Sequence, residues 1–119
     1  VVVDDVGVGG GVTDRLRELG YQVMAFQGGA KAADDKRYAN ATTEAWHLMA
    51  EALRKGELAL ENDPELVAQL SSRRARIQSD RRLLLESKED LKAKGGKSPD
   101  CGDALAMTFA QYARPRIWV

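Results

Sequence analysis

Val1-Val2-Val3-Asp4-Asp5-Val6-Gly7-Val8-Gly9-Gly10-Gly11-Val12 opens the chain, and this stretch decides the fold. The β-branched apolar residues at 1–6 predict a buried strand of a parallel sheet. The glycines predict a flexible turn, after which Val12, Leu16 and Leu19 recur at helical spacing as a packing face. Gly20 ends that helix, and residues 21–26 form a second apolar strand. Residues 1–27 therefore predict a compact βαβ unit with a right-handed crossover, typical of an α/β fold.

Length and composition limit the alternatives. The 119 residues suit one domain with one hydrophobic core. The single cysteine excludes an internal disulfide framework and any zinc site with several cysteines. The apolar runs are too short to span a membrane, and the N-terminus lacks the pattern of a signal peptide.

The charges are unevenly distributed along the chain. The totals are 18 basic and 18 acidic residues, so the net charge is zero. Residues 1–72 hold seven Lys and Arg against twelve Asp and Glu, a net of −5, whereas residues 73–97 hold nine against four, a net of +5. The neutral total thus conceals a basic segment that could contact a polyanion, or could simply be a solvated surface.

The remaining segments predict mainly helices. Asn40 or Thr42 can cap a helix that runs to about residue 55, and residues 57–60 read as a short extended piece. Asp63-Pro64 starts a helix that ends near residue 72. Residues 74–86 predict a β-hairpin with arginines on one side. A capping-box pattern at Ser87 starts a short helix, and a last helix spans residues 98–113.

Two acidic motifs could carry chemistry. Asp4 and Asp5 lie at the carboxyl end of the first strand, where open α/β sheets place their sites, although either could merely cap the turn. Asp100 and Asp103 fall in the first turn of the last helix, where acids usually stabilise the helix dipole. Alternatively, one of them meets Asp4 and holds a hard divalent cation, which prefers carboxylate oxygens.

The glycine turn also invites a nucleotide-binding interpretation. The spacing fits a dinucleotide motif poorly, because Val12 stands where the third glycine belongs and Phe26-Gln27 ends the second strand without an acid. A P-loop is excluded as well, since no Gly-Lys-Ser/Thr follows. A nucleotide-binding α/β domain remains an alternative hypothesis.

Four runs of sequence resemble one known family in the right order. They are residues 4–16, Tyr38-Ala39-Asn40 with Glu44-Ala45-Trp46, residues 85–92, and residues 98–109 (Ser-Pro-Asp-Cys-Gly-Asp-Ala-Leu-Ala-Met-Thr-Phe). Together they resemble the nuclease domain of the large terminase subunit of tailed bacteriophages. The resemblance implies an RNase H-like mixed sheet flanked by helices, with a basic β-hairpin. It also implies an endonuclease that cuts concatemeric viral DNA during genome packaging with Mg²⁺ or Mn²⁺, in a two-metal site.

The resemblance assigns residues to roles. Asp4 falls on the family's second metal-binding acid, and Asp5 is the substitute if the register slips by one. Asp103 falls on the final acid, and Asp100 is an auxiliary ligand or simply the helix start. Contacts to DNA phosphates are expected from five basic residues: Lys88, Lys92, Lys97, Arg81 and Arg82.

The chain departs from the family pattern at its start. The family's first acid lies on an earlier strand that has no counterpart here, and no Walker A sequence of an ATPase domain is present. We therefore expect a partial domain made of the βαβ unit 1–27, a helical and hairpin part 40–97, and the acidic helix 98–113. Implied partners are double-stranded DNA, the terminase small subunit and the portal protein, in the host cytoplasm. An inactive fragment that self-associates through its exposed sheet edge is the other alternative.

Overall fold

The computed structural model describes residues 1–7 and 9–115. It is a mixed α/β structure of small sheets and helices. In chain order the elements are β1 (Val2–Asp4), α1 (Gly9–Glu18), β2 (Met24–Phe26), α2 (Ala41–Arg54), α3 (Pro64–Ser72), β3 (Ala75–Ile77), β4 (Leu83–Leu85), α4 (Lys88–Ala93), α5 (Asp100–Thr108) and the 3-10 helix η1 (Phe109–Tyr112).

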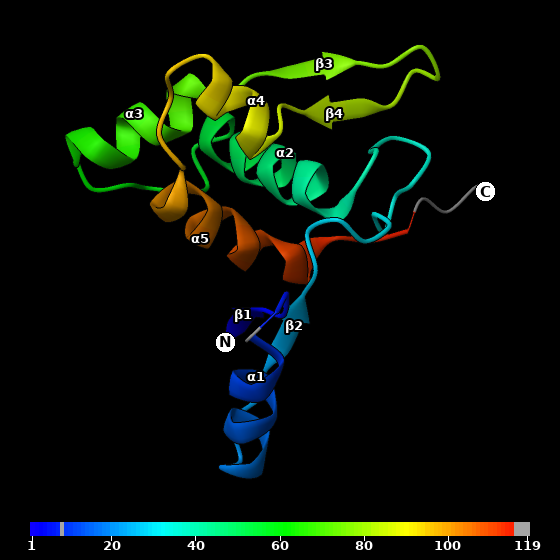
Figure 1. Cartoon of the computed structure of the whole chain (residues 1–119), viewed down its shortest axis with the longest axis vertical. Helices are drawn as coiled ribbons and strands as arrows, with labels where there is room; N and C mark the ends of the chain where they lie inside the picture. Colours follow the sequence, from blue (N-terminus) through cyan, green and yellow to red (C-terminus); the bar gives the residue numbers. More distant parts are fainter. Residues whose placement is uncertain (8, 116–119) are drawn as a thin grey trace.

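The described residues of 1–26 form an N-terminal arm that projects from the rest of the molecule (Figure 1). β1 pairs with β2 in parallel, with Val2 opposite Met24 and Asp4 opposite Phe26. Helix α1 connects the two strands and packs against both. The predicted βαβ unit is thus confirmed.

The arm differs from the prediction in length and burial. The strands are shorter than expected, β1 is half-buried at best, and α1 already begins at Gly9 within the predicted flexible turn. Val12 and Leu19 are exposed and Leu16 is half-buried, so the predicted apolar face of this helix is only partly covered. The reason is architectural: in the described part of the chain, β1 has β2 as its one strand neighbour, so little covers the arm's apolar side chains.

The body of the molecule is built around α2 and α5, which pack against each other. Asn40 caps α2 as predicted, because its Oδ1 accepts hydrogen bonds from the backbone N–H and hydroxyl of Thr43. The core contains Trp46, Met49, Leu85 and Ala106. A second cluster of Phe26, Ala45 and Ala110 attaches the arm to this body.

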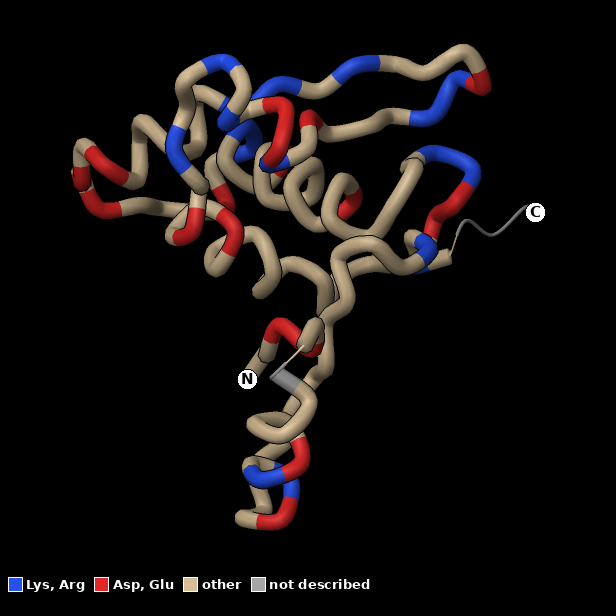
Figure 2. The backbone as a smooth tube through the Cα atoms, in the orientation of Figure 1, with Lys and Arg blue, Asp and Glu red and all other residues tan. Residues whose placement is uncertain are grey.

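Helices α3 and α4 and a hairpin complete the body. Asp63 and Ser87 cap α3 and α4 through their side chains, as the sequence predicts. β3 and β4 form the expected antiparallel hairpin, and Figure 2 shows Lys and Arg positions along it and near α4. Residues 57–60 form no strand, because no described strand pairs with them.

The strands of the described residues form two separate pairs, β1–β2 and β3–β4. The α/β class and the basic hairpin therefore agree with prediction, whereas the expected mixed sheet is represented by a parallel pair and an antiparallel pair. No helix in residues 1–7 and 9–115 is long and apolar enough to cross a membrane.

Candidate functional site

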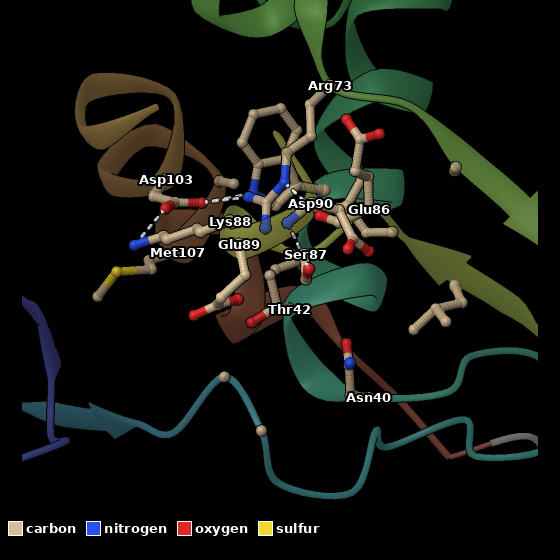
Figure 3. Close-up of a pocket in the computed structure, with 18 of the residues that line it drawn as sticks. Asn40, Thr42, Arg73, Glu86, Ser87, Lys88, Glu89, Asp90, Asp103 and Met107 are labelled. Atoms are coloured by element: carbon tan, nitrogen blue, oxygen red, sulfur yellow. Dashed lines mark hydrogen bonds and ion pairs between the residues drawn. The ribbon is translucent and has the colours of Figure 1, made fainter. Parts of the chain in front are cut away.

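A pocket of about 670 Å³ lies where the arm, the hairpin base and the body meet. Its walls come from the end of β1, the loop after β2, the start of α2, the segment 84–90 and helix α5. Asp4 and Asp103, which are 99 positions apart in the sequence, both line it. Figure 3 shows the side chains of this pocket, with Asp103 joined to its partners.

Asp103 is the pocket acid with the most hydrogen-bond and ion-pair partners. Its Oδ1 accepts hydrogen bonds from Trp46 Nε1 at 2.9 Å and from Arg73 Nη1 at 2.8 Å. Its Oδ2 lies 2.8 Å from Lys88 Nζ in an ion pair that lacks hydrogen-bond alignment (Figure 3). Three elements therefore converge on one carboxylate, which is 15% exposed.

Local packing explains why α5 can bring this acid so close to α2. Gly102 lies against the Trp46 ring, and a Cβ at this position would be 3.0 Å from Trp46 Cη2. The Gly102 backbone N–H donates to Gln69 Oε1 at 2.9 Å, so α3 satisfies one of the free donors at the start of α5. Asp103 follows in the first turn of α5, where a carboxylate also suits the helix dipole.

Asp4 and Asp5 point to different surroundings. Asp4 is exposed, lines the pocket and accepts a 3.3 Å hydrogen bond from the Val6 backbone N–H. Asp5 accepts a 3.1 Å hydrogen bond from the Thr13 hydroxyl of α1 and does not line the pocket. This placement favours Asp4 over Asp5 as the candidate metal ligand. Neighbouring side chains along a strand point to opposite faces, so only one of the two was expected to face the pocket.

Asp100, for which the sequence left open a role as auxiliary ligand or as helix start, also lies outside the pocket. Its Oδ1 accepts a 2.6 Å hydrogen bond from the Ser98 hydroxyl, and its side chain is exposed. Its neighbour Cys101 is exposed as well. Asp100 therefore lies at the start of α5 and outside the pocket that Asp103 lines.

Three acids of the pocket were missed from the sequence: Glu86, Glu89 and Asp90. Glu86 forms an ion pair with Lys94, and its Oε1 is buried without a described hydrogen-bond partner. The sequence of this segment predicts the end of a hairpin and a capping box. Nothing in that pattern marks these three acids as residues of a site. Among the described residues, no three His, Cys, Asp or Glu side chains are close enough to form a metal-binding cluster.

The donor set nevertheless suits one hard cation. Mg²⁺ and similar ions are often held by one or two carboxylates, with waters and substrate phosphates completing the shell. Asp4 and Asp103 are carboxylates on a shared pocket, and Asp103 Oδ2 is a buried oxygen that accepts no aligned hydrogen bond. Asp4 and Asp103 are therefore the candidate ligands for a divalent ion, and the described residues alone do not form a complete cage.

The predicted DNA-binding cations are distributed over three places. Lys88 lies in the pocket, paired with Asp103 and 42% exposed. Lys92 and Lys97 are exposed outside it, and Arg81 is exposed at the hairpin turn with a positive φ of 68°. Arg82 forms an ion pair with Asp80 at 2.9 Å. The hairpin also supplies Arg74 and Arg76 to the pocket wall, two residues that the sequence did not single out.

His47 does not belong to the pocket. Its Nδ1 lies 2.7 Å from the hydroxyl of the buried Tyr38, and burial lowers the pKa of His47 below its ordinary value. The same burial raises the pKa of Tyr38. This pair is a packing contact of α2 that lies outside the pocket.

The sequence matches no protein-family model and no curated protein. Solved structures are similar. The nuclease domain of the large terminase subunit gp2 of bacterial virus Sf6, in a point mutant with manganese, superposes with a TM-score of 0.70 at 22% identity over 91% of this chain. A mutant of the same domain with calcium gives 0.69 at 22% identity, and the domain without the mutation gives 0.67 at 23% identity.

This chain spans 63–64% of the length of those solved domains. The identities are low, so the comparison concerns the fold. The helices, the small sheets and their order agree with the fold that the four sequence runs predicted. The chain has the RNase H-like fold of the nuclease domain of a phage large terminase subunit.

Proposed function

We propose that this chain is the nuclease part of a phage terminase and hydrolyses DNA with the help of a divalent metal ion. The observation that carries the proposal is that Asp4 and Asp103, from opposite ends of the sequence, line one pocket whose walls also hold Arg74, Arg76 and Lys88. Structures of similar domains have been solved with manganese and with calcium, and both are hard cations that carboxylates can hold.

Asp4 and Asp103 would hold the metal, with Mg²⁺ and Mn²⁺ as the candidates. When bound, such an ion activates water and stabilises the leaving oxygen of a phosphodiester. Asp103 contributes a carboxylate whose orientation is fixed by Trp46 and Arg73. Lys88 lies beside the same carboxylate and would supply an ammonium for a DNA phosphate at the pocket.

The cutting of concatemeric DNA during packaging, in the host cytoplasm, belongs to the same proposal. So do the small subunit and the portal protein as partners. The exposed cations Lys92, Lys97 and Arg81 would contact the phosphate backbone outside the pocket, with Arg82 beside its Asp80 partner. Contacts of this kind give affinity without sequence specificity.

The test is cleavage of supercoiled plasmid with Mn²⁺ or Mg²⁺. The variants Asp4→Asn and Asp103→Asn should abolish metal-dependent nicking. The matched controls Asp5→Asn and Asp100→Asn remove neighbouring carboxylates that lie outside the pocket, and they should nick like the unaltered chain. All five proteins should give the same circular dichroism spectrum.

Several outcomes would contradict the proposal. Equal nicking in all five proteins would mean a contaminating nuclease. No nicking by a folded, unaltered chain would favour the inactive module. A thermal shift with a dinucleotide but none with Mn²⁺ would favour nucleotide binding instead.

A second candidate role is self-association through the arm. Val1, Val6 and Tyr21 are 71%, 65% and 57% exposed, and β1 has an open edge in the described structure. Open strand edges with apolar side chains promote pairing between chains. Sedimentation velocity would test this role, since Tyr21→Lys, at an exposed position outside the pocket, should remove any concentration-dependent dimer.

A further inference from the structure

Arg73 is a buried cation with three distinct contacts. Its side chain is 4% exposed, and its guanidinium stacks over the Trp46 ring, with 5.0 Å from Cζ to the ring centroid. Its Nε donates to the Glu86 backbone oxygen at 2.8 Å, and its Nη1 donates to Asp103 Oδ1 at 2.8 Å. Arg73 thereby connects the end of β4, helix α2 and helix α5.

Trp46 acts on the same oxygen as Arg73. Its Nε1–H donates to Asp103 Oδ1 at 2.9 Å while its ring carries the stacked guanidinium. A carboxylate oxygen has two lone pairs, so these two donors occupy Oδ1. The oxygen left for another partner is Oδ2, which is beside Lys88.

We propose that Arg73 and Trp46 are positioning residues that fix the Asp103 carboxylate in one orientation and leave Oδ2 as its cation ligand. This inference rests on the proposed function, because it assumes that Asp103 holds the metal. Donors behind a ligating carboxylate orient it in metal sites, and their loss typically lowers metal affinity or activity about 10–100-fold.

Packing and stability alone do not explain why Arg73 and Trp46 both contact Asp103. A buried ion pair is a poor source of stability compared with apolar residues of the same volume. An indole could also satisfy its single donor on any backbone carbonyl. Here two donors from different elements, 57 and 30 residues away from Asp103, converge on one oxygen of the one pocket acid that α5 supplies.

The experiment uses two variants that leave the net charge unchanged. Trp46→Phe keeps a ring for the guanidinium and removes the N–H donor. Arg73→Lys keeps the charge, but one ammonium cannot reproduce the fork that reaches both Glu86 O and Asp103 Oδ1. The matched controls are Arg37→Lys and Tyr38→Phe, because Arg37 stacks over Tyr38 at 5.3 Å and neither residue lines the pocket.

Mn²⁺ binding is measured by electron paramagnetic resonance of the free ion, and thermal unfolding is followed on the same samples. We expect about tenfold weaker Mn²⁺ binding in Trp46→Phe and Arg73→Lys, and unchanged binding in the two controls. A metal-free readout is the indole N–H resonance of Trp46, identified by its loss in Trp46→Phe. It should shift in Asp103→Ala, which removes its acceptor.

The outcomes separate the inference from the function on which it rests. Unchanged Mn²⁺ affinity in folded Trp46→Phe and Arg73→Lys would overturn the positioning role and leave the metal site in place. An indole resonance that does not respond to Asp103→Ala would overturn the geometry itself. An unaltered chain that binds no Mn²⁺ would refute the proposed metal site and the positioning role together.

Discussion

Removing the Asp103 carboxylate should cost much more stability than a typical surface substitution, because it leaves Arg73 buried without its counter-charge. The Arg73 side chain is 4% exposed and that of Asp103 is 15% exposed. Breaking a buried pair by deleting one partner costs about 3–5 kcal/mol. Asp103→Ala also leaves Trp46 Nε1 without its acceptor. The free energy of unfolding of a native protein is about 5–15 kcal/mol, so this variant should lose a large share of its stability.

Asp103→Asn should be milder. Its amide oxygen can still accept from Trp46 and Arg73, so it gives up the charge but keeps both hydrogen bonds. Arg73 still loses its counter-charge, so the two retained hydrogen bonds, at about 1 kcal/mol each, only reduce the cost of about 3–5 kcal/mol expected for Asp103→Ala. This difference is the reason for using Asn rather than Ala in the cleavage test.

The assay is urea unfolding followed by circular dichroism, in a double-mutant cycle of Asp103→Ala and Arg73→Met. Replacing both partners removes the buried charge, so the double variant should be more stable than the sum of the single losses predicts. We expect a coupling of about 2–3 kcal/mol, near the upper end for contacting residues. Additive losses, or an Asp103→Ala cost below about 1 kcal/mol, would refute the claim that this pair is buried and coupled.

Three other predictions follow from local structure. Acidification below a pH of about 6.5 should lower the free energy of unfolding, because burial lowers the pKa of His47 and the unfolded chain then binds more protons than the folded chain. Urea titrations at several pH values would measure this, and His47→Gln should flatten that part of the pH profile. Gly96→Ala should cost about 1–3 kcal/mol in the same assay, since its Cβ would lie 2.9 Å from the Leu91 backbone oxygen, whereas alanine at the open position Gly29 should cost less. Arg81→Gln and Lys92→Gln should each lower the slope of log DNA affinity against log salt by about one if they contact phosphates, and an unchanged slope would place them outside the interface.

The elements that the sequence predicted well are those that local chemistry determines. Asn40, Asp63 and Ser87 each cap a helix with a side-chain oxygen, and such caps act within three residues. The hairpin and the βαβ order were equally accessible, because turn residues and alternation are local signals. Gly95 follows α4 with a φ of 83°, a backbone conformation that glycine adopts readily.

The arm shows where local patterns mislead. Val12 and Leu19 have helical spacing, but spacing identifies a stripe and not what covers it. Their exposure depends on which strands flank β1, a property of the whole fold. Likewise, residues 57–60 have strand-like composition, yet a strand forms only where another strand can pair with it.

The partners of Asp103 could not be predicted from the sequence for a similar reason. Trp46 lies in an apolar helical stripe and does pack in the core, but an indole has a polar N–H that can serve a site from within that core. Arg73 lies at the start of a basic run that reads as surface, and it is the buried member of that run. Their roles follow from tertiary contacts across 57 and 30 residues.

The two acids of the pocket are therefore held to different degrees. Asp103 is fixed by two donors and a neighbouring ammonium, whereas Asp4 is exposed at the end of a three-residue strand. The position of Asp4 relative to Asp103 depends on the arm, which the cluster around Phe26, Ala45 and Ala110 attaches to the body. Under the proposed function, metal-assisted hydrolysis would depend on how precisely the two ligands are placed, so the arm, rather than α5, would limit the geometry of the site. Any contact that covers the arm's exposed apolar side chains would thus act on the pocket through Asp4.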